Sequence, residues 1–525
     1  MTSCRTIIAT VALAVTAWVP HGGATITTVA DLVAAVSTGG ENDVVHIGPG
    51  VFELGAPLEP KAGMTIIGAG AGQTIIRNDT AVWDVGNEGL PDNGTDQNTV
   101  VQTAYLFSFP NATNNVTIAD VTLSGPELHG ALYCNNCDNL TLERITFDSF
   151  LWSAVRVFRV SGGVIRDNTF IDAGGRANVT SGPTGGCIYG TFITTTDIFN
   201  NRFFRTPAGA SNVFGVKGRK FNDSRIFDNT IDVSFSIELP FENDSGVEIF
   251  NNWLDGVVSI PKFAGGLTGL PEGGGFDIHH NYFTRTYSIE GPRNSTDIHT
   301  NLFDFSTEDD GGNLVSIFGN NGSPVSPGPF RFFNNNVKNP GRGVFWSAPV
   351  QNEAEFFNNH IIGSTTITPR TEGLFGIKLG PNNDGESVDL STVSIRDNII
   401  ELTGLARPLL RGATPGSIPD TTVVNNTLIN VSDTGSYTNA DTGAPRGPLE
   451  PLCFRVGVDH EYTVDGFDLW CTADADRDSS VTGADVTALL GEVAAETCLG
   501  DVNNSGQADA FDVAAHQVLI SRSCP

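Results

Sequence analysis

Positive charge is scarce in this sequence. Its 525 residues include 29 Lys and Arg against 59 Asp and Glu, which gives a formal net charge of −30 at pH 7. So negative a chain repels polyphosphates and anionic lipid surfaces, which disfavours a nucleic-acid or anionic-membrane binder. Residues 141–225 oppose this trend, with eleven Lys or Arg and six Asp or Glu, a local net charge of +5. That segment needs a specific explanation.

Long apolar runs are absent beyond the N-terminus. Arg5, an apolar run from Ile7 to Val19 and the small residues Gly-Gly-Ala at 22–24 follow the order of a secretory signal peptide. The run is too short to cross a bilayer. We therefore predict a signal peptide over residues 1–24, no membrane span, and a mature chain that is secreted or attached to the cell surface.

Methionine and cysteine are rare as well, with two and eight residues, whereas glycine is abundant with 60. Glycine together with many Asn, Thr, Phe, Val and Ile residues predicts β-structure with tight turns. Cys134 and Cys137 favour a local disulfide or a pair of buried thiols over a metal or redox site, and Cys187 leaves an odd count. The late cysteines, where we expect disulfides as in secreted proteins, are Cys453, Cys471, Cys498 and Cys524.

The mature N-terminus combines one helical pattern with short strands. Residues 31–36 have helical apolar spacing behind the candidate caps Thr27 and Thr28. Residues 44–53 and 64–68 are strand-like segments interrupted by Gly and Pro. A helix at this position would cover the open end of a stack of strands.

A repeat of the form Ile-x-x-Asn-x-Phe dominates the chain from about residue 116. Its gaps run from 20 to 39 residues, which predicts coils of short strands with loops of variable length on a constant frame. Asparagine suits the corner of each coil and forms amide ladders when stacked. The repeated asparagines are Asn168, Asn201, Asn229, Asn252, Asn281, Asn301, Asn335, Asn359, Asn398 and Asn426.

A second column lies two residues before each asparagine. It contains Phe199, Phe227, Phe250, His279, His299, Phe333 and Phe357. An aromatic stack between coils explains it, with the two histidines as members of the stack rather than metal ligands. Together the two columns resemble the right-handed parallel β-helix of the pectate-lyase-like superfamily. The resemblance covers residues 25–432 and implies an all-β, right-handed single-stranded parallel β-helix of the kind that houses polysaccharide lyases and glycoside hydrolases.

A four-residue phrase gives the candidate functional face. Phe235-Ser236-Ile237-Glu238 matches Tyr287-Ser288-Ile289-Glu290, and weaker copies recur along the chain. Because side chains alternate along a strand, the aliphatic third residue should be buried, while the small second and variable fourth residues share the outer face. The expected buried column is Ile237, Ile260, Ile289 and Ile317. The expected outer column is Tyr133, Arg156, Tyr189, Lys217, Glu238, Pro261, Glu290 and Phe318.

Cations near this column favour cleavage of a uronic-acid polysaccharide by β-elimination. Arg156 would neutralise the substrate carboxylate, and Lys217 or Tyr189 would abstract the proton beside it. The other residues expected to bind substrate are Tyr133, Arg219, Lys220, Lys262 and Arg293. The +5 segment favours such an anionic substrate over a neutral one.

Two alternatives stay open. Glu238 and Glu290 are two coils apart, roughly 9.6 Å by strand spacing. Carboxyl groups separated by roughly 6.5–9.5 Å leave room for an attacking water, as in an inverting glycoside hydrolase. Parallel β-helices also serve as adhesins, so a non-catalytic glycan-binding or surface protein is the third hypothesis.

The C-terminal residues differ in composition from the repeats. Residues 433–452 have the Gly, Pro and Thr content of a linker, and residues 453–525 contain two twelve-residue loops. The expected ligands of these loops are Asp474, Asp476, Asp478, Ser480 and Asp485, then Asp501, Asn503, Ser505, Gln507 and Asp512. Oxygen ligands at alternate positions, closed by an acid at the twelfth, suit Ca²⁺. Two such loops, each followed by one helical segment, resemble a dockerin, which implies a small α-helical EF-hand-like domain with two Ca²⁺ sites and a cohesin-like partner.

Overall fold

A computed structural model gives the fold of the chain. The structure describes residues 25–85, 102–109, 112–174, 185–206, 213–239, 245–259, 275–284, 289–290, 296–305, 315–318, 330–338, 344–347, 354–364, 377–379, 393–403, 407–408, 410–411, 423–424, 426–429, 431–432, 462–464 and 467–469. The predicted signal peptide, the predicted linker and the two predicted calcium loops lie outside these residues.

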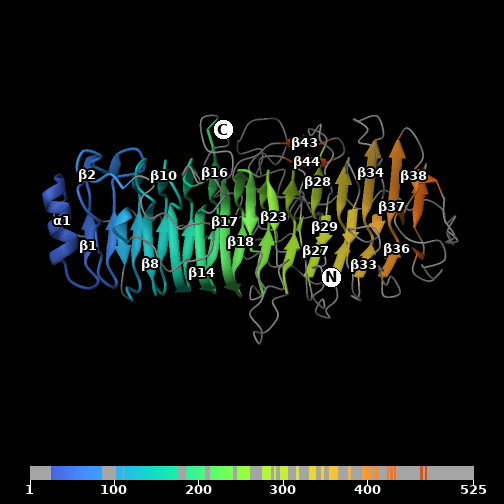
Figure 1. The fold of residues 1–525 in the computed structure, drawn as a ribbon, viewed down its shortest axis with the longest axis horizontal. Coiled ribbons are helices and arrows are strands. Elements are labelled where there is room, and N and C mark those ends of the chain that lie inside the picture. Colours follow the sequence, from blue (N-terminus) through green and yellow to red (C-terminus); the bar gives the residue numbers. More distant parts are fainter. Residues whose placement is uncertain are drawn as a thin grey trace, which may run out of the picture.

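Three parallel sheets run the length of the molecule, and successive strands of one coil pass from sheet I to sheet II to sheet III (Figure 1). Sheet I contains β1 (Val44–His46), β3 (Thr65–Ile67), β6 (Thr117–Ala119), β9 (Thr141–Glu143), β12 (Val164–Arg166), β15 (Asp197–Phe199), β18 (Arg225–Phe227), β21 (Glu248–Phe250), β24 (Asp277–His279), β27 (Thr296–His299), β30 (Phe330–Phe333), β33 (Ala354–Phe357), β36 (Val393–Arg396) and β40 (Val423–Val424).

Sheet II contains β2 (Gly50–Leu54), β4 (Thr74–Asn78), β7 (Thr122–Ser124), β10 (Thr146–Asp148), β13 (Thr169–Ile171), β16 (Arg202–Phe204), β19 (Thr230–Asp232), β22 (Trp253–Leu254), β25 (Tyr282–Phe283), β28 (Leu302–Asp304), β31 (Asn336–Lys338), β34 (His360–Ser364), β37 (Ile399–Thr403) and β41 (Thr427–Ile429). Sheet III contains β5 (Tyr105–Phe109), β8 (Gly130–Asn135), β11 (Val155–Ser161), β14 (Gly186–Thr194), β17 (Phe214–Asn222), β20 (Phe235–Glu238), β23 (Val257–Ser259), β26 (Ile289–Glu290), β29 (Val315–Phe318), β32 (Val344–Ser347), β35 (Ile377–Leu379) and β39 (Leu410–Arg411).

Every pairing within these three sheets is parallel, so the predicted all-β parallel β-helix is confirmed. Two short pairs complete the described strands: β38 (Arg407–Pro408) with β42 (Val431–Ser432), which is parallel, and β43 (Tyr462–Val464) with β44 (Phe467–Leu469), which is antiparallel. A short 3₁₀ helix, η1, covers Gln102–Ala104.

The predicted helix is α1 (Val29–Thr38), at the N-terminal end of the stack (Figure 1). The Thr28 hydroxyl accepts the backbone N–H of Asp31 at 3.1 Å, so Thr28 is the N-cap. Leu32 and Val36 are buried, and the polar face points to solvent. The helix therefore covers the exposed apolar end of the coils, as the sequence predicts.

The asparagine column forms an amide ladder through the molecule. All ten predicted asparagines are buried, and the side-chain amide of each one before Asn426 donates to the side-chain carbonyl oxygen of the next, for example Asn229 to Asn252 at 3.0 Å. The left-handed backbone lies one residue earlier than expected: Asp228 and Asn251 have φ of 53°, and they precede Asn229 and Asn252. The preceding residue therefore makes the corner, and the asparagine joins successive coils.

The aromatic column forms the predicted stack on the outer face of sheet I. Ring centroids are 4.7 Å apart for Phe199 and Phe227, and 5.1 Å apart for His279 and His299. Each histidine is also paired with a carboxylate, His279 with Glu248 at 3.1 Å. This confirms that His279 and His299 belong to the stack.

Candidate functional site

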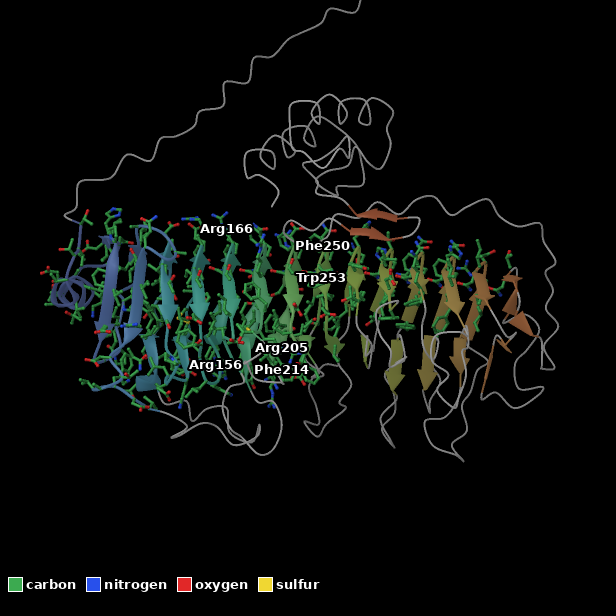
Figure 2. All side chains as sticks on the ribbon, turned by 90° about the horizontal axis from the view of Figure 1, so that it is seen from above. Arg156, Arg166, Arg205, Phe214, Phe250 and Trp253 are labelled. Atoms are coloured by element: carbon green, nitrogen blue, oxygen red, sulfur yellow. A yellow bond between two sulfur atoms is a disulfide. The ribbon has the colours of Figure 1, made fainter. Side chains whose placement is uncertain are left out.

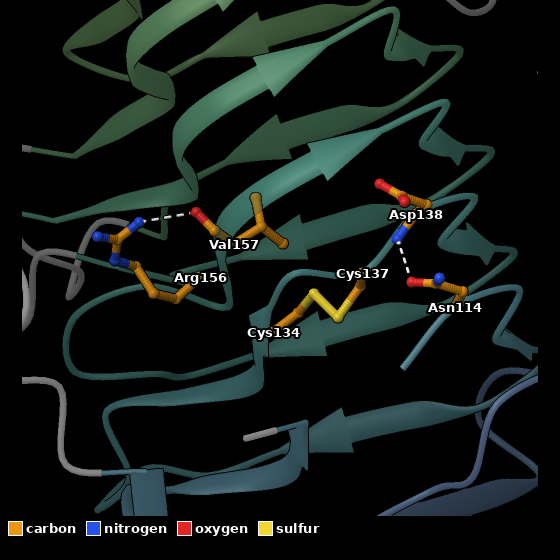
Figure 3. Close-up of a disulfide and its surroundings, with 6 residues drawn as sticks. All are labelled: Asn114, Cys134, Cys137, Asp138, Arg156 and Val157. Carbon is orange, nitrogen blue, oxygen red and sulfur yellow. Dashed lines mark hydrogen bonds between the residues drawn. A yellow bond between two sulfur atoms is a disulfide. The ribbon is translucent and has the colours of Figure 1, made fainter. Parts of the chain in front are cut away.

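The predicted outer column exists on sheet III. The register of β8, β11, β14, β17 and β20 aligns Tyr133, Arg156, Tyr189, Lys217 and Glu238 in successive coils. Inside the coil, Cys134 and Cys137 form the predicted local disulfide, and Cys187 is a buried free thiol. Arg156 points to the opposite side from Val157 and the disulfide (Figure 3). The column thus lies outside the core of the coil.

Beyond Glu238 the predicted register is wrong by two residues in β23 and β29 and correct in β26. Glu238 aligns with Ser259, then Glu290 and then Ser316, so Pro261 and Phe318 are not members of the column. In the register of Ile237 lie Val258, Ile289 and Val315, so Val258 and Val315 take the places expected for Ile260 and Ile317. Between Phe235 and Ile237, β20 also has one residue more than β23, which is a local pairing irregularity. Glu238 and Glu290 remain two coils apart.

The small second residues of the phrase do not share the outer face, contrary to the prediction. Ser236 is fully buried, and a Cβ on Gly215 would lie 2.7 Å from a methyl carbon of Ile231 in the core. In the pairing of β14 with β17, Gly186 and Ile188 have partners and Cys187 has none. The strict alternation of inward and outward side chains therefore breaks at this position. These residues are small because the interior leaves no room for a larger side chain. They point inward, so they do not create open surface beside the outer column.

Much of the column is covered. Arg156 is 0% exposed, Tyr189 is 1% and Tyr133 is 7%. These tyrosines join Tyr105 and Trp152 in an apolar cluster that is separate from the core. The sequence reading missed Tyr105 and Trp152, because neither belongs to the four-residue phrase. The burial removes Arg156 from direct contact with a polymer on this face.

The Arg156 guanidinium is held by backbone and rings. Its Nη1 donates to the carbonyl oxygens of Val157 at 2.9 Å and Tyr189 at 3.2 Å, the first of which Figure 3 shows. Its carbon Cζ lies 4.3 Å from the centre of the Tyr189 ring. Burial lowers the pKa of Arg156, and the nearby tyrosines oppose this shift. Burial likewise raises the pKa of Tyr133, with Arg156 opposing, so this phenol stays protonated at neutral pH.

Lys217 and Glu238 form the accessible part of the column. The Lys217 Nζ atom lies 2.8 Å from Glu238 Oε2, and the two side chains are 14% and 21% exposed. Nζ also lies 4.2 Å from the centre of the Phe214 ring. This face is opposite that of sheet I: Arg156 and Phe214 lie on one side of the β-helix, whereas Arg166 and Phe250 lie on the other (Figure 2). Lys217 and Glu238 therefore form a close ion pair on the outer face of sheet III.

Arg219 and Lys220 follow Lys217 on β17, and both are partly exposed. The backbone of Glu290 is in the column, and its side chain is outside the described residues, as are Lys262, Arg293 and all ten predicted calcium ligands. Among the residues that the structure describes, no group of three or more His, Cys, Asp or Glu side chains is arranged to hold a metal. Within the same residues, no helix has the length and apolar composition of a membrane span.

No protein-family model matches the sequence, and no curated protein matches it either. Solved structures do resemble the fold. The A-module of the Azotobacter vinelandii mannuronan C-5 epimerase AlgE4 is 14% identical, with a TM-score of 0.36 over 74% of this chain and 100% of that one. The PL6 family alginate lyase AlyGC is 13% identical, with a TM-score of 0.46 over 84% and 59% of the two chains.

A tailspike protein of E. coli bacteriophage HK620 is 12% identical, with a TM-score of 0.42 over 76% of this chain and 74% of that one. At these identities the likeness concerns the fold alone. The chemistry of this chain has to be argued from its own residues.

Proposed function

We propose that this protein is a secreted polysaccharide lyase that cleaves a uronic-acid-containing polysaccharide by β-elimination on the outer face of sheet III. The observation that carries the proposal is the Lys217–Glu238 pair at 2.8 Å, with Arg219 two residues further along the same strand and face. A carboxylate base, an ammonium acid and a guanidinium that neutralises a carboxylate are the three groups that this reaction needs.

In the proposed reaction, Arg219 pairs with the uronate carboxylate and makes the neighbouring C–H bond acidic. A carboxylate oxygen of Glu238 takes that proton, and the electrons of the C–H bond form the new C=C bond. The bond from the next carbon to the glycosidic oxygen breaks, and the oxygen leaves with its electron pair and takes a proton from Lys217 Nζ. Proton transfer from Glu238 to Lys217 across their 2.8 Å contact then restores the pair.

This assignment differs from the roles expected from sequence. Lys217 forms an ion pair with Glu238, so we assign Lys217 the role of general acid rather than base. Tyr189 is almost fully buried. Tyr133 lies four coils from Glu238, roughly 19 Å by strand spacing, and so takes no part in the same bond cleavage.

The test is incubation of the purified protein with polygalacturonate, alginate and neutral glucans. We expect acidic polymers to yield products with the ultraviolet absorbance of an unsaturated uronate. New reducing ends without that absorbance would support hydrolysis instead. Binding without any new ends would point to a glycan-binding or adhesin function.

Hydrolysis is the second candidate, favoured by one observation. Glu238 and Glu290 occupy the same column two coils apart, with Ser259 between them. Glu238, paired with Lys217, would activate a water, and Glu290 would protonate the leaving oxygen with inversion. Glu290→Gln separates the candidates, because it should abolish hydrolysis and leave β-elimination nearly unchanged.

The terminal regions complete the proposal. The N-terminal segment would direct the chain out of the cell, and the two loops in 453–525 would bind Ca²⁺ and dock a cohesin-like protein. Calorimetric titration of the full chain with Ca²⁺ should give two sites, and Asp501→Ala should remove one. Unchanged stoichiometry in that variant would contradict the second site.

A further inference from the structure

A cationic cluster lies at the corner where the strands of sheet III end. Arg159, Phe192 and Lys220 occupy the same position in three successive coils, by the register of β11, β14 and β17. Lys220 Nζ lies 3.9 Å from the centre of the Phe192 ring, and Arg159 Cζ lies 4.7 Å from that of Phe158. We call Phe158, Arg159, Phe192 and Lys220 the corner cluster.

The backbone of the corner cluster is unfavourable for its residues. Arg159, Phe192 and Lys220 have φ of 57°, 59° and 58°, the left-handed region that Asn, Asp and Gly tolerate best. The corner after sheet I, by contrast, is occupied mostly by Asn and Asp, such as Asp167, Asn200 and others. Strained residues of this kind persist where their side chains serve a purpose. Packing does not supply that purpose here, because Arg159 is exposed.

The charges of the corner cluster also differ from those of the arginines that form ion pairs along the β-helix. Arg144 pairs with Asp120, Arg225 with Asp197 and Arg396 with Asp397. Arg159 and Lys220 contact aromatic rings instead, and within the described part of the chain neither has a carboxylate within 4.0 Å. In a chain with a net charge of −30, an exposed cation and a partly exposed one that face no acid among the described residues are available to an external anion.

We propose that the corner cluster is a second anion-binding subsite, which holds carboxylates of the acidic polysaccharide two coils apart, roughly 10 Å by strand spacing. Arg219 lies on β17 between Lys217 and Lys220, so a polymer that leaves the Lys217–Glu238 pair meets the corner next. The partly exposed rings of Phe158 and Phe192 add apolar contact area beside the two cations. The subsite rests on the proposed function for its substrate class, but it binds and takes no part in bond cleavage.

The experiment uses the full chain and compares Arg159→Asn, Lys220→Asn and the double variant with wild type. Asparagine tolerates left-handed backbone, so thermal stability should be unchanged or higher. Affinity for polygalacturonate and alginate at low salt should fall about tenfold for each charge removed. Dextran tests for neutral sugars, and dextran sulfate tests whether the site distinguishes carboxylates from sulfates.

Arg144→Gln is the matched control, because Arg144 is also a left-handed, exposed arginine but is paired with Asp120 and Glu143. Uronate binding by this variant should equal that of wild type. An equal loss in Arg144→Gln would show a net-charge effect and overturn the subsite. Unchanged binding in the double variant, with uronate cleavage intact, would overturn the subsite and leave the proposed function standing. A wild type that neither binds nor cleaves uronates would overturn both.

Discussion

The outer faces of sheets I and III are built from the same coils, yet they use their side chains differently. On sheet I, aromatic rings stack in one column and charges pair in the next, as with Arg225 and Asp197 at 2.6 Å. On sheet III, Arg156 is buried among rings, Lys217 meets Glu238, and Arg159 projects from a strained corner. Regular repetition indicates a face that holds coils together, and departure from it indicates a face under another constraint.

The stack on sheet I also lacks the geometry of a sugar platform. The rings of Phe227 and Phe250 are 4.8 Å apart with an interplanar angle of 2°, so each ring face is covered by its neighbour. Only ring edges reach solvent, and stacking on a sugar needs an open face. The comparison therefore indicates that the sheet I stack holds the coils together, and the binding that we propose lies on sheet III. Variants on each face test this division.

The largest expected effect is on sheet III. Glu238→Gln and Lys217→Met should each lower kcat on an acidic polysaccharide by about 10²–10⁴-fold, because each removes a group that moves a proton. Thermal stability should fall by about 1–3 kcal/mol, because each change leaves the other member of a partly buried ion pair without its partner. Steady-state rates and melting curves measure the two quantities.

Arg225→Gln is the control for that experiment, because it removes an exposed paired cation from sheet I. It should alter neither the rate nor, by more than about 1 kcal/mol, the stability. Full activity of both sheet III variants on a cleaved substrate would place catalysis elsewhere.

The asparagine ladder should show the opposite behaviour. Asn252 is fully buried, and its Oδ1 accepts both the backbone N–H and the side-chain amide of Asn229, each at 3.0 Å. Asn252→Ala leaves those donors without an acceptor and should lower the free energy of unfolding by about 3 kcal/mol. Asp232→Ala, an exposed change on sheet II, should cost under about 0.5 kcal/mol. Chemical denaturation measures both, and an equal cost would contradict the ladder's role.

A smaller, pH-dependent effect is expected on sheet I. Burial, with the charges of His279 and His299, lowers the pKa of His280 to about 4, and Asp277 opposes this. The unfolded state binds a proton below about pH 6.5, while folded His280 stays neutral until about pH 4. Stability is therefore complete above pH 6.5 and falls by on the order of 2 kcal/mol as the pH drops toward 4.

His280→Asn checks this origin, because asparagine accepts the left-handed φ of 53° and does not titrate. Its stability should change less than that of wild type between pH 6.5 and 4. Parallel pH profiles for the two proteins would assign the loss to other groups.

The fold could be predicted from the sequence, but the candidate site could be predicted only in part. The asparagine and aromatic columns were predictable because one residue type recurs at one register in many coils. The column through Tyr133, Arg156 and Glu238 was predictable for the same reason, up to the irregularity after Phe235. Burial was not, because Trp152 and Tyr105 come from segments that do not repeat. Alternation along a strand says which way a side chain points, and not what covers it.

The smallest expected effect concerns Tyr105, one of the aromatic residues that cover sheet III. Tyr105 is fully buried beside Tyr133, with ring centroids 5.7 Å apart, and its hydroxyl has no hydrogen-bond partner among the residues that the structure describes. Burial raises its pKa, so the group is a neutral phenol that has lost its bonds to water. Tyr105→Phe keeps the ring and removes the unsatisfied hydroxyl, so the free energy of unfolding should rise by about 1 kcal/mol. Tyr133→Phe is the contrast, because Tyr133 bonds Gln102 and should lose stability. A destabilised Tyr105→Phe variant would mean that the hydroxyl is hydrogen-bonded in solution. The aromatic cluster over sheet III would then be packed less tightly than the burial of Tyr105 indicates.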